Sequence, residues 1–152
     1  MDSSDSIRTA FERNARACTA RPGLGQTTFV TRVRVQEGLT CIIEDGPWRL
    51  PADFPQALGG NAAGPTPGTF GRAALGSCLA VCCVMWAARL GVPFAAVSVE
   101  VRADADTRGL LGLDDVPPGY TDVQYTVSVT SPAPTEDVLR VLTTMRTIAD
   151  GG

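Results

Sequence analysis

Residues 66–91, TPGTFGRAALGSCLAVCCVMWAARLG, decide the fold because they predict one long helix. Thr66 can cap this helix, and Pro67 suits the first helical position, where a backbone N–H is not needed. Gly91 and Pro93 supply the stop signal at the other end. The sequence therefore predicts a helix that begins and ends sharply within this stretch.

The middle of this helix carries no charge and holds a cysteine. Every side chain from residue 73 to residue 88 is uncharged, so we expect the helix to be buried almost all round. Cys78 lies inside this run. A thiol in such a place is either a small hydrophobic side chain or a protected nucleophile, and the helix alone leaves both readings open.

The composition predicts a single domain over residues 1–152. Hydrophobic residues make up 44% of the chain and charged residues 19%, as in ordinary globular domains. The net charge of −3 gives no reason to expect binding to nucleic acid or to an acidic membrane surface. The uncharged run is also shorter than the roughly 20 apolar residues that a membrane span needs. We therefore expect neither nucleic acid nor membrane as a partner.

The N-terminus and the cysteines indicate the compartment. The chain does not open with a basic segment followed by an apolar one, so we expect a cytoplasmic protein. Its five cysteines are an odd number at scattered spacings, which fits reduced thiols. No C-x-x-C pair occurs, and we expect no metal site.

The chain contains neither histidine nor lysine, and this limits its chemistry. The absence of histidine excludes Ser-His-Asp and Cys-His catalysis and every metal site that uses histidine. The absence of lysine excludes Schiff-base chemistry on a lysine side chain. All 13 basic residues are arginines, so a cysteine nucleophile would need an arginine or a helix dipole to stabilise its thiolate. We expect no cofactor.

Hydrophobic alternation predicts strands before the central helix. Residues 26–36 alternate as a strand does, and residues 39–44 and 48–50 follow as two further strands joined by a hairpin turn. The first 25 residues are polar, and we expect them to form an N-terminal extension with a short helix over residues 7–17. We therefore expect a small antiparallel sheet in this half of the chain.

The second half repeats the order of strands followed by a helix. Residues 95–103 and 121–130 alternate, and residues 107–119 form a long Gly- and Pro-containing connection between them. Residues 134–149 place apolar side chains at helical spacing, which predicts an amphipathic helix. The whole pattern predicts an α+β domain with helices packed on a sheet.

Two segments resemble the central-helix signature of the OsmC/Ohr family. They are Gly64-Pro65-Thr66-Pro67 and, inside the helix, Ala73-Ala74-Leu75-Gly76-Ser77-Cys78-Leu79-Ala80. The helix end and the strands and helix that follow are similar too, so the resemblance covers roughly residues 58–149. It implies an OsmC-like fold with an antiparallel sheet, a long buried central helix and a C-terminal amphipathic helix. It also implies an intertwined homodimer with its active site at the subunit interface.

The resemblance further implies peroxide chemistry at cysteine. In the family, a cysteine of the central helix attacks a peroxide, often an organic hydroperoxide, and a second cysteine later in the chain resolves the resulting sulfenic acid. Cys78 matches the first position. An arginine from the N-terminal strands assists that cysteine in the Ohr branch, and Arg32 and Arg34 are both candidates here.

The chain departs from the family pattern at two points. Where the Ohr branch has Asn-Pro-Glu, this chain has Thr66-Pro67-Gly68, so the assisting carboxylate is missing. No cysteine follows Cys83, so the second cysteine was lost or the C-terminal part of the fold is shortened. Cys82 and Cys41 are the possible secondary thiols, although an external thiol is the more natural resolver because a bridge between Cys78 and Cys82 would distort the helix.

Two function classes follow from this resemblance. In the first, the protein is a thiol-dependent peroxidase that uses Cys78 alone and an external thiol reductant. In the second, a dimer of the same fold binds a small apolar or acyl ligand, or uses Cys78 in another nucleophilic reaction. Either class needs an apolar pocket near the cysteine, for which Phe70 and Trp86 are the candidates.

Overall fold

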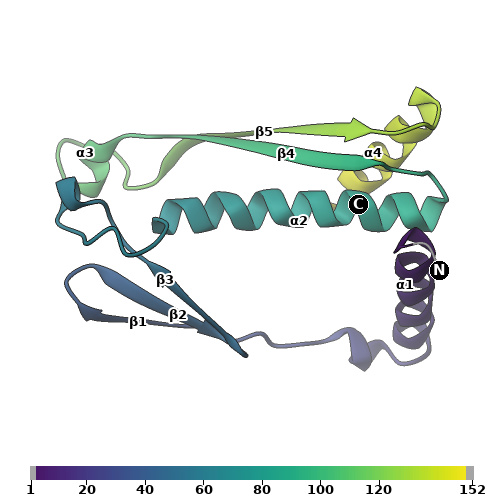
Figure 1. Cartoon of the computed structure of the whole chain (residues 1–152), viewed down its shortest axis with the longest axis horizontal. Helices are drawn as coiled ribbons and strands as arrows, with labels where there is room; N and C mark the ends of the chain where they lie inside the picture. The colour runs from purple at the N-terminus through teal and green to yellow at the C-terminus, as the bar shows by residue number, and fades with distance from the viewer. Residues whose placement is uncertain (1–2, 150–152) are drawn as a thin grey trace. The chain divides into compact units, whose positions relative to one another are not determined.

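The computed structural model describes residues 3–149 in four α-helices, two short 3-10 helices and five strands (Figure 1). The chain divides into two compact units, and each is described by itself. Among the described residues, the first unit comprises residues 3–24 and 75–149, and the second comprises residues 25–74. The antiparallel sheets and the helices confirm the predicted α+β class.

The predicted central helix is α2, Pro67–Leu90. The backbone N–H of Thr69 donates to the Thr66 hydroxyl at 3.2 Å, so Thr66 caps the helix as predicted. At the other end Gly91 has a φ of +69°, and the N–H of Val92 donates to the carbonyl of Ala87 at 2.9 Å. This left-handed glycine ends the helix at the predicted place.

In the first unit, α2 packs against a two-stranded antiparallel sheet. The strands are β4, Ala96–Ala105, and β5, Tyr120–Thr130. Every second residue of β4 from Val97 to Ala103 is half-buried, which confirms the predicted alternation. Gly76 allows close packing, because a Cβ there would lie 3.3 Å from a methyl group of Val101. The lack of a side chain at residue 76 thus brings helix and sheet together.

Two further helices contact the C-terminal half of α2. Helix α4, Thr135–Ala149, supplies Val141, which is fully buried, and Met145 to the core. Helix α1, Ser3–Ala20, lies beside the end of α2 and has no buried residue of its own (Figure 1). This helix is longer than the predicted 7–17. A fourth helix, α3, Thr107–Leu110, lies in the connection between β4 and β5, where we predicted only a loop.

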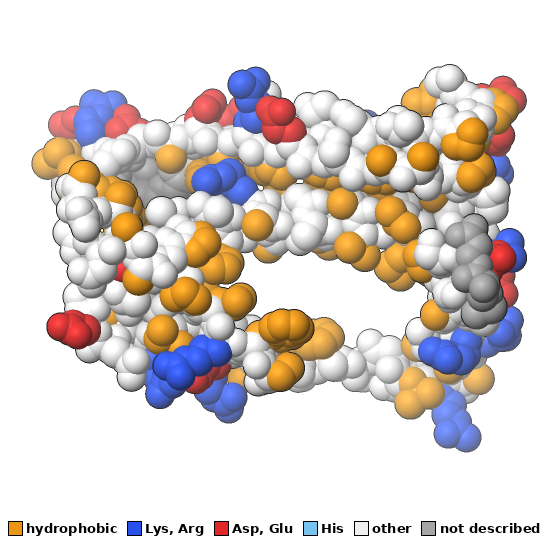
Figure 2. Space-filling model, in the orientation of Figure 1, with side chains coloured by type: hydrophobic (Ala, Val, Ile, Leu, Met, Phe, Trp, Pro, Cys, Tyr) orange, Lys and Arg blue, Asp and Glu red, His pale blue; other side chains and the backbone are white. Residues whose placement is uncertain are grey.

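The prediction that α2 is buried almost all round is wrong for the single chain. Its buried residues are Gly76, Cys83, Ala87 and Ala88. Val81 is 56% exposed, and Figure 2 shows hydrophobic side chains along one side of the helix. The cause is that one two-stranded sheet and the neighbouring helices cover only part of the circumference of a 24-residue helix. The uncharged run correctly predicted that the surface of α2 is apolar. It did not predict which parts of that surface other elements cover.

Helix α2 is also the one helix in the described chain that is long and apolar enough to cross a membrane. This holds by length and composition only, and the core helix of a soluble protein meets the same test. The 24 residues of α2 exceed the uncharged run that we judged too short. The length of α2 therefore does not exclude a membrane, and the expectation of no membrane contact stays a prediction.

The second unit is built on a three-stranded antiparallel sheet. Its strands are β1, Arg32–Glu37, β2, Thr40–Asp45, and β3, Trp48–Ala52, in the order β1-β2-β3. The predicted first strand began too early, at residue 26. Arg32 pairs with Glu44, and β2 ends at Asp45, so residues before 31 have no neighbouring strand to pair with.

A buried carboxylate organises the loop that follows β3. Asp53 is 1% exposed and accepts hydrogen bonds from the Thr40 hydroxyl at 2.8 Å and from the backbone N–H groups of Phe54, Asn61 and Ala63 at 2.7, 3.1 and 3.2 Å. Burial by itself raises the pKa of Asp53, but these four hydrogen bonds outweigh it and hold the pKa below the ordinary value. Gly60 fits this arrangement, because a Cβ there would lie 2.0 Å from the Phe54 carbonyl oxygen.

We predict that Asp53 stabilises the fold in a pH-dependent way. Because its folded-state pKa is lowered, its contribution is present above the ordinary value of 3.8 and is lost as the pH falls below it. Asp53→Asn replaces one acceptor oxygen by a donor and should lower the Tm at neutral pH by on the order of 5 °C. Thermal unfolding of variant and wild type should show the difference narrowing towards about pH 3. A difference that is the same at both pH values would contradict this account, and the exposed Asp115→Asn serves as control.

Candidate active site

Cys78 lies on α2 and differs from the other cysteines in its exposure. All five cysteines fall within the described residues, and none is in a disulfide. Cys18, Cys41 and Cys82 are half-buried, Cys83 is buried, and Cys78 alone is exposed. Since attack on a substrate requires an accessible sulfur, Cys78 is the cysteine best placed to act as a nucleophile.

The two cysteines that follow Cys78 on α2 are progressively less accessible. Burial, and then the neighbouring Cys78 thiol, raise the pKa of Cys82. Cys83 is fully buried, and its Sγ lies 3.3 Å from the sulfur of Met145 on α4. Burial is also the main reason why the pKa of Cys83 is raised. The raised pKa of each thiol disfavours its thiolate, and Cys83 serves as a core residue.

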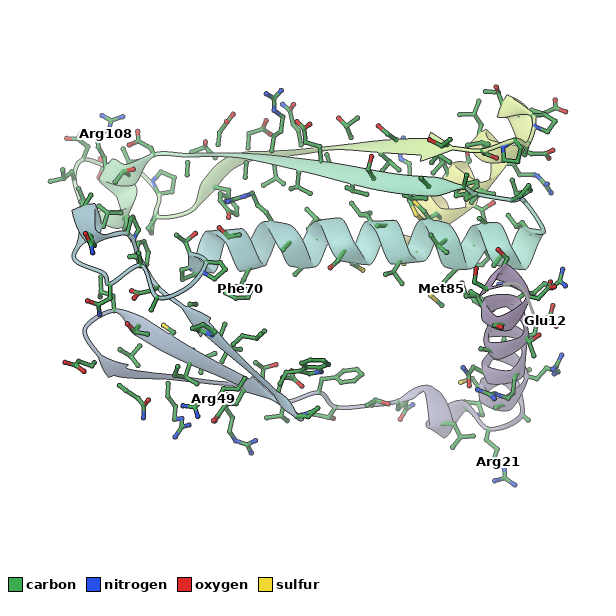
Figure 3. All side chains as sticks on the ribbon, in the orientation of Figure 1. Glu12, Arg21, Arg49, Phe70, Met85 and Arg108 are labelled. Carbon is green, nitrogen blue, oxygen red and sulfur yellow. The ribbon has the colours of Figure 1, made fainter. Side chains whose placement is uncertain are left out.

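Cys78 belongs to an apolar stripe, defined here as Leu75, Cys78, Cys82 and Met85. Successive members are separated by three, four and three residues, which places them on one side of α2. Leu75 is 38% and Met85 37% exposed, and Met85 projects from the helix in Figure 3. This spacing is the one with which helices pack side by side. The stripe therefore has the form of a helix-packing surface that the single chain leaves uncovered.

An apolar groove opens beside the stripe, between α1, α2 and the start of β4. Its volume is about 550 Å³. It is lined by Ile7, Ala80, Val81, Val84, Met85, Phe94, Ala95, Ala96 and Val97. No lining residue carries a charge. Sequence reasoning did not find this groove, because its walls come from three elements that are far apart in the chain.

Phe70 and Trp86, the two predicted pocket residues, do not line this groove. Trp86 packs edge-on against Phe11 of α1, with ring centres 5.5 Å apart, and the Arg89 guanidinium stacks 4.6 Å from the Trp86 ring centre. Trp86 thus joins α1 to α2. Phe70 is half-buried in the first turns of α2 and belongs to the second unit (Figure 3).

Arg32 and Arg34 both lie on β1 of the second unit, on the same side of the strand. Arg34 forms an ion pair with Glu44 at 2.8 Å. Arg32 stands directly opposite Glu44 in the register, yet it has no ion pair within the described residues. Arg32 and Arg49 instead line a polar hollow of about 390 Å³. Of the two predicted arginines, Arg32 is thus the one whose charge is not balanced by a carboxylate in the described chain.

Cys41 lies on the opposite face of the same sheet. It pairs with Val35 on one side and Ala52 on the other, and its thiol is 3.8 Å from the Leu39 carbonyl oxygen. The register therefore separates Cys41 from the arginines, which share the other face. Within residues 3–149, no group of three or more Cys, Asp or Glu side chains could hold a metal ion.

The comparisons with known proteins agree with this description. The family model described as OsmC-like protein matches residues 59–147. A crystal structure of an OsmC-like protein from Mycoplasma pneumoniae is similar, with a TM-score of 0.65 and 12% identity, over 79% of this chain and 81% of that chain. No curated protein matches the sequence.

Two further solved structures are described as organic hydroperoxide resistance proteins. The one from Legionella pneumophila has a TM-score of 0.56 and 12% identity, over 81% of this chain and 86% of that chain. The one from Vibrio cholerae has a TM-score of 0.54 and 13% identity, over 81% of each chain. At these identities, the likeness establishes a shared fold.

We predict that the cysteines on α2 differ sharply in reactivity. In the native, reduced protein, iodoacetamide should modify Cys78 first and Cys83 at least about tenfold more slowly, because a buried thiol is inert. Peptide mass spectrometry over a time course measures both rates in one sample. In urea-unfolded protein the two rates should become similar, which is the control. Equal rates in the native protein would contradict the burial of Cys83.

Proposed function

Because the chain belongs to the OsmC family, we propose that it is a thiol-dependent peroxidase that reduces organic hydroperoxides with Cys78. One observation carries this proposal. Cys78 is the single exposed cysteine of the chain, and it lies on α2 inside the region that the family model matches. The descriptions of the Legionella and Vibrio proteins as hydroperoxide resistance proteins support the same substrate class.

The proposed reaction needs one cysteine and two equivalents of an external thiol. The Cys78 thiolate attacks one peroxide oxygen, the O–O bond breaks, and the alcohol leaves with a proton while Cys78 becomes a sulfenic acid. An external thiol condenses with this sulfenic acid to give a mixed disulfide and water. A second external thiol then releases Cys78 as a thiol and leaves as the external disulfide.

The burial pattern supports an external reductant over a second cysteine of the chain. Cys83 is enclosed in the core against Met145. Cys82 is four residues from Cys78 on an intact helix, where Cβ atoms stand about 5–6 Å apart, too far for a disulfide without bending the helix. The cycle proposed here therefore takes its reducing equivalents from outside the chain.

We further propose that the working form is a homodimer in which a second copy covers the apolar stripe. The exposed members of the stripe support this, because natural proteins rarely leave such a helix face in water. The two-stranded sheet of β4 and β5 supports it too, since a sheet of two strands is marginally stable by itself. Cys78 then lies at the subunit interface, where the proposed cycle requires that a peroxide and an external thiol can both reach it.

Arg32 is the arginine that we assign to stabilise the Cys78 thiolate. Its guanidinium has no ion pair within the described residues, whereas the charge of Arg34 is balanced by Glu44. The position equivalent to the family's assisting glutamate is Gly68, which offers no carboxylate. The arginine is then the main electrostatic support of the thiolate in this chain.

We predict rapid and specific oxidation of Cys78 by an organic hydroperoxide. Reduced protein mixed with cumene hydroperoxide should form sulfenic acid at Cys78 about 100-fold or more faster than free cysteine does, because the proposed site stabilises the thiolate. Dimedone trapping followed by mass spectrometry measures the rate at each cysteine. Cys78→Ser should abolish the signal, and Cys82→Ser should retain it. Oxidation at the rate of free cysteine would overturn the peroxidase proposal and favour a ligand-binding role.

We predict that the two arginines are not equivalent. Arg32→Gln should slow sulfenic acid formation at Cys78 by about tenfold, equivalent to a loss of about 1.4 kcal/mol of thiolate stabilisation. Arg34→Gln should have little effect, and Arg49→Gln, on the same face of the sheet, is the matched control. A larger loss for Arg34→Gln than for Arg32→Gln would contradict the assignment. The rate of dimedone labelling with cumene hydroperoxide is the measurement for all three variants.

A further inference from the structure

The connection between β4 and β5 carries an exposed leucine tip, defined here as Leu110, Leu111 and Leu113. These side chains are 57%, 60% and 51% exposed. Neither the proposed reaction nor the core of the first unit uses them. Three neighbouring leucines with more than half of their surface in water are costly unless another surface covers them.

Electrostatic contacts hold the leucine tip in one shape. Arg108, which Figure 3 labels beside α3, binds Asp106 through Nε at 3.0 Å and through its terminal nitrogen at 2.6 Å. Its other terminal nitrogen lies 3.2 Å from Asp114. The Asp106 carboxylate also accepts from the backbone N–H of Arg108 and so caps the short helix α3. One arginine thus ties both ends of the tip together.

Backbone packing fixes the tip further. A Cβ at Gly109 would lie 2.3 Å from the Pro117 carbonyl oxygen, so only glycine fits there. The N–H of Leu113 donates to the Arg108 carbonyl at 2.9 Å. Asp114 adopts a φ of +55°, a left-handed conformation that aspartate tolerates better than most residues other than glycine. The close packing at Gly109 and the hydrogen bond of Leu113 hold the tip in one shape with its three leucines exposed, as a rigid contact surface requires.

The apolar groove described above is a recess whose apolar lining complements the projecting leucine tip. It lies at Ala96 and Val97, where β4 begins, whereas the tip begins just after β4 ends at Ala105. Ten strand residues span about 33 Å, so the tip cannot reach the groove of its own chain. The first unit therefore carries a projecting apolar surface at one end of β4 and an apolar recess at the other.

We propose that the leucine tip of one copy fills the apolar groove of a second copy, and that the contact is reciprocal. The inference rests on the homodimer of the proposed function and specifies one of its contacts. A two-fold axis between the ends of β4 would make both contacts at once and close the assembly. Val81 and Met85 belong to the groove and lie on or beside the apolar stripe, so both surfaces form one continuous interface.

The charges beside the leucine tip and beside the apolar groove favour a second copy of the chain as the partner. Asp115 lies beside the tip, and Arg89 lies one helical turn beyond Met85 of the groove. Neither has an ion pair within the described residues, so they can pair across the interface. An anionic membrane is a poor alternative partner for the tip, because Asp106, Asp114 and Asp115 surround the leucines.

A charge-pair experiment tests this contact. Leu111→Glu places a negative charge on the tip, and Ala96→Lys places a positive charge in the exposed wall of the groove, away from α2. Each single variant should raise the dimer dissociation constant by about tenfold or more, since each symmetric dimer holds two copies of the contact. In the double variant, the new carboxylate at position 111 of one copy would face the new ammonium group at position 96 of the other. The double variant should therefore dimerise at least about tenfold better than the product of the single effects predicts.

Sedimentation velocity over a range of protein concentrations gives the dissociation constants, and circular dichroism checks the fold of each variant. Leu24→Glu is the matched control, because Leu24 is 60% exposed and lies in neither surface. Leu111→Ser, which adds no charge, should weaken the dimer in the same direction. An unchanged dissociation constant for Leu111→Glu, or single effects that simply multiply, would overturn the contact.

The outcomes separate this inference from the proposed function. A dimer that is insensitive to both tip variants contradicts the tip contact and leaves the homodimer standing. A wild type that remains monomeric contradicts both. Formation of Cys78 sulfenic acid, followed on the same samples, reports on the peroxidase chemistry independently of either contact.

Discussion

The close contact between α2 and β4 is the constraint on which the rest of the first unit depends. Gly76 brings Val101 against the helix, and on the same helix Cys83 packs on Met145 of α4. These contacts fix which side of α2 faces the core. They also determine by exclusion which side stays open, and Cys78 with the apolar stripe lies there. The exposure of the Cys78 thiol is thus a consequence of how the helix is packed.

This packing gives the three cysteines of α2 different chemical roles, although they lie within six residues. Cys83 points into the core, where burial raises its pKa, and Cys82 lies at the boundary. Of the five cysteines, Cys78 alone is exposed. With no histidine or lysine in the chain, an arginine or a helix dipole is left to support a thiolate, and Arg32 has no ion pair among residues 3–149. The proposed chemistry therefore depends on two groups, the Cys78 thiol and the Arg32 guanidinium. The first is assigned because it is exposed, and the second because it has no ion pair in the described chain.

The sequence predicted the elements better than their surroundings. Thr66, Pro67 and Gly91 fixed the ends of α2 because capping is local chemistry. The predicted first strand began before β1 does. The alternating pattern extends to residues before Arg32, but β2 ends at Asp45 and leaves those residues without a neighbouring strand. The uncharged run was taken as fully buried, but the covering surface is a matter of tertiary structure and of partners. The apolar groove and the rigid leucine tip were missed for the same reason: both are formed by residues distant in sequence or by backbone packing.

We propose that the open side of α2 is an interface between two copies of this chain. Sedimentation equilibrium of the reduced wild-type protein tests it most directly. A chain of 15.9 kDa should sediment at twice that mass across the micromolar range, because a stable interface of this kind buries on the order of 2,000 Å² or more. A mass that stays at 15.9 kDa at every concentration would contradict the account, since the apolar stripe would then have no second copy to cover it.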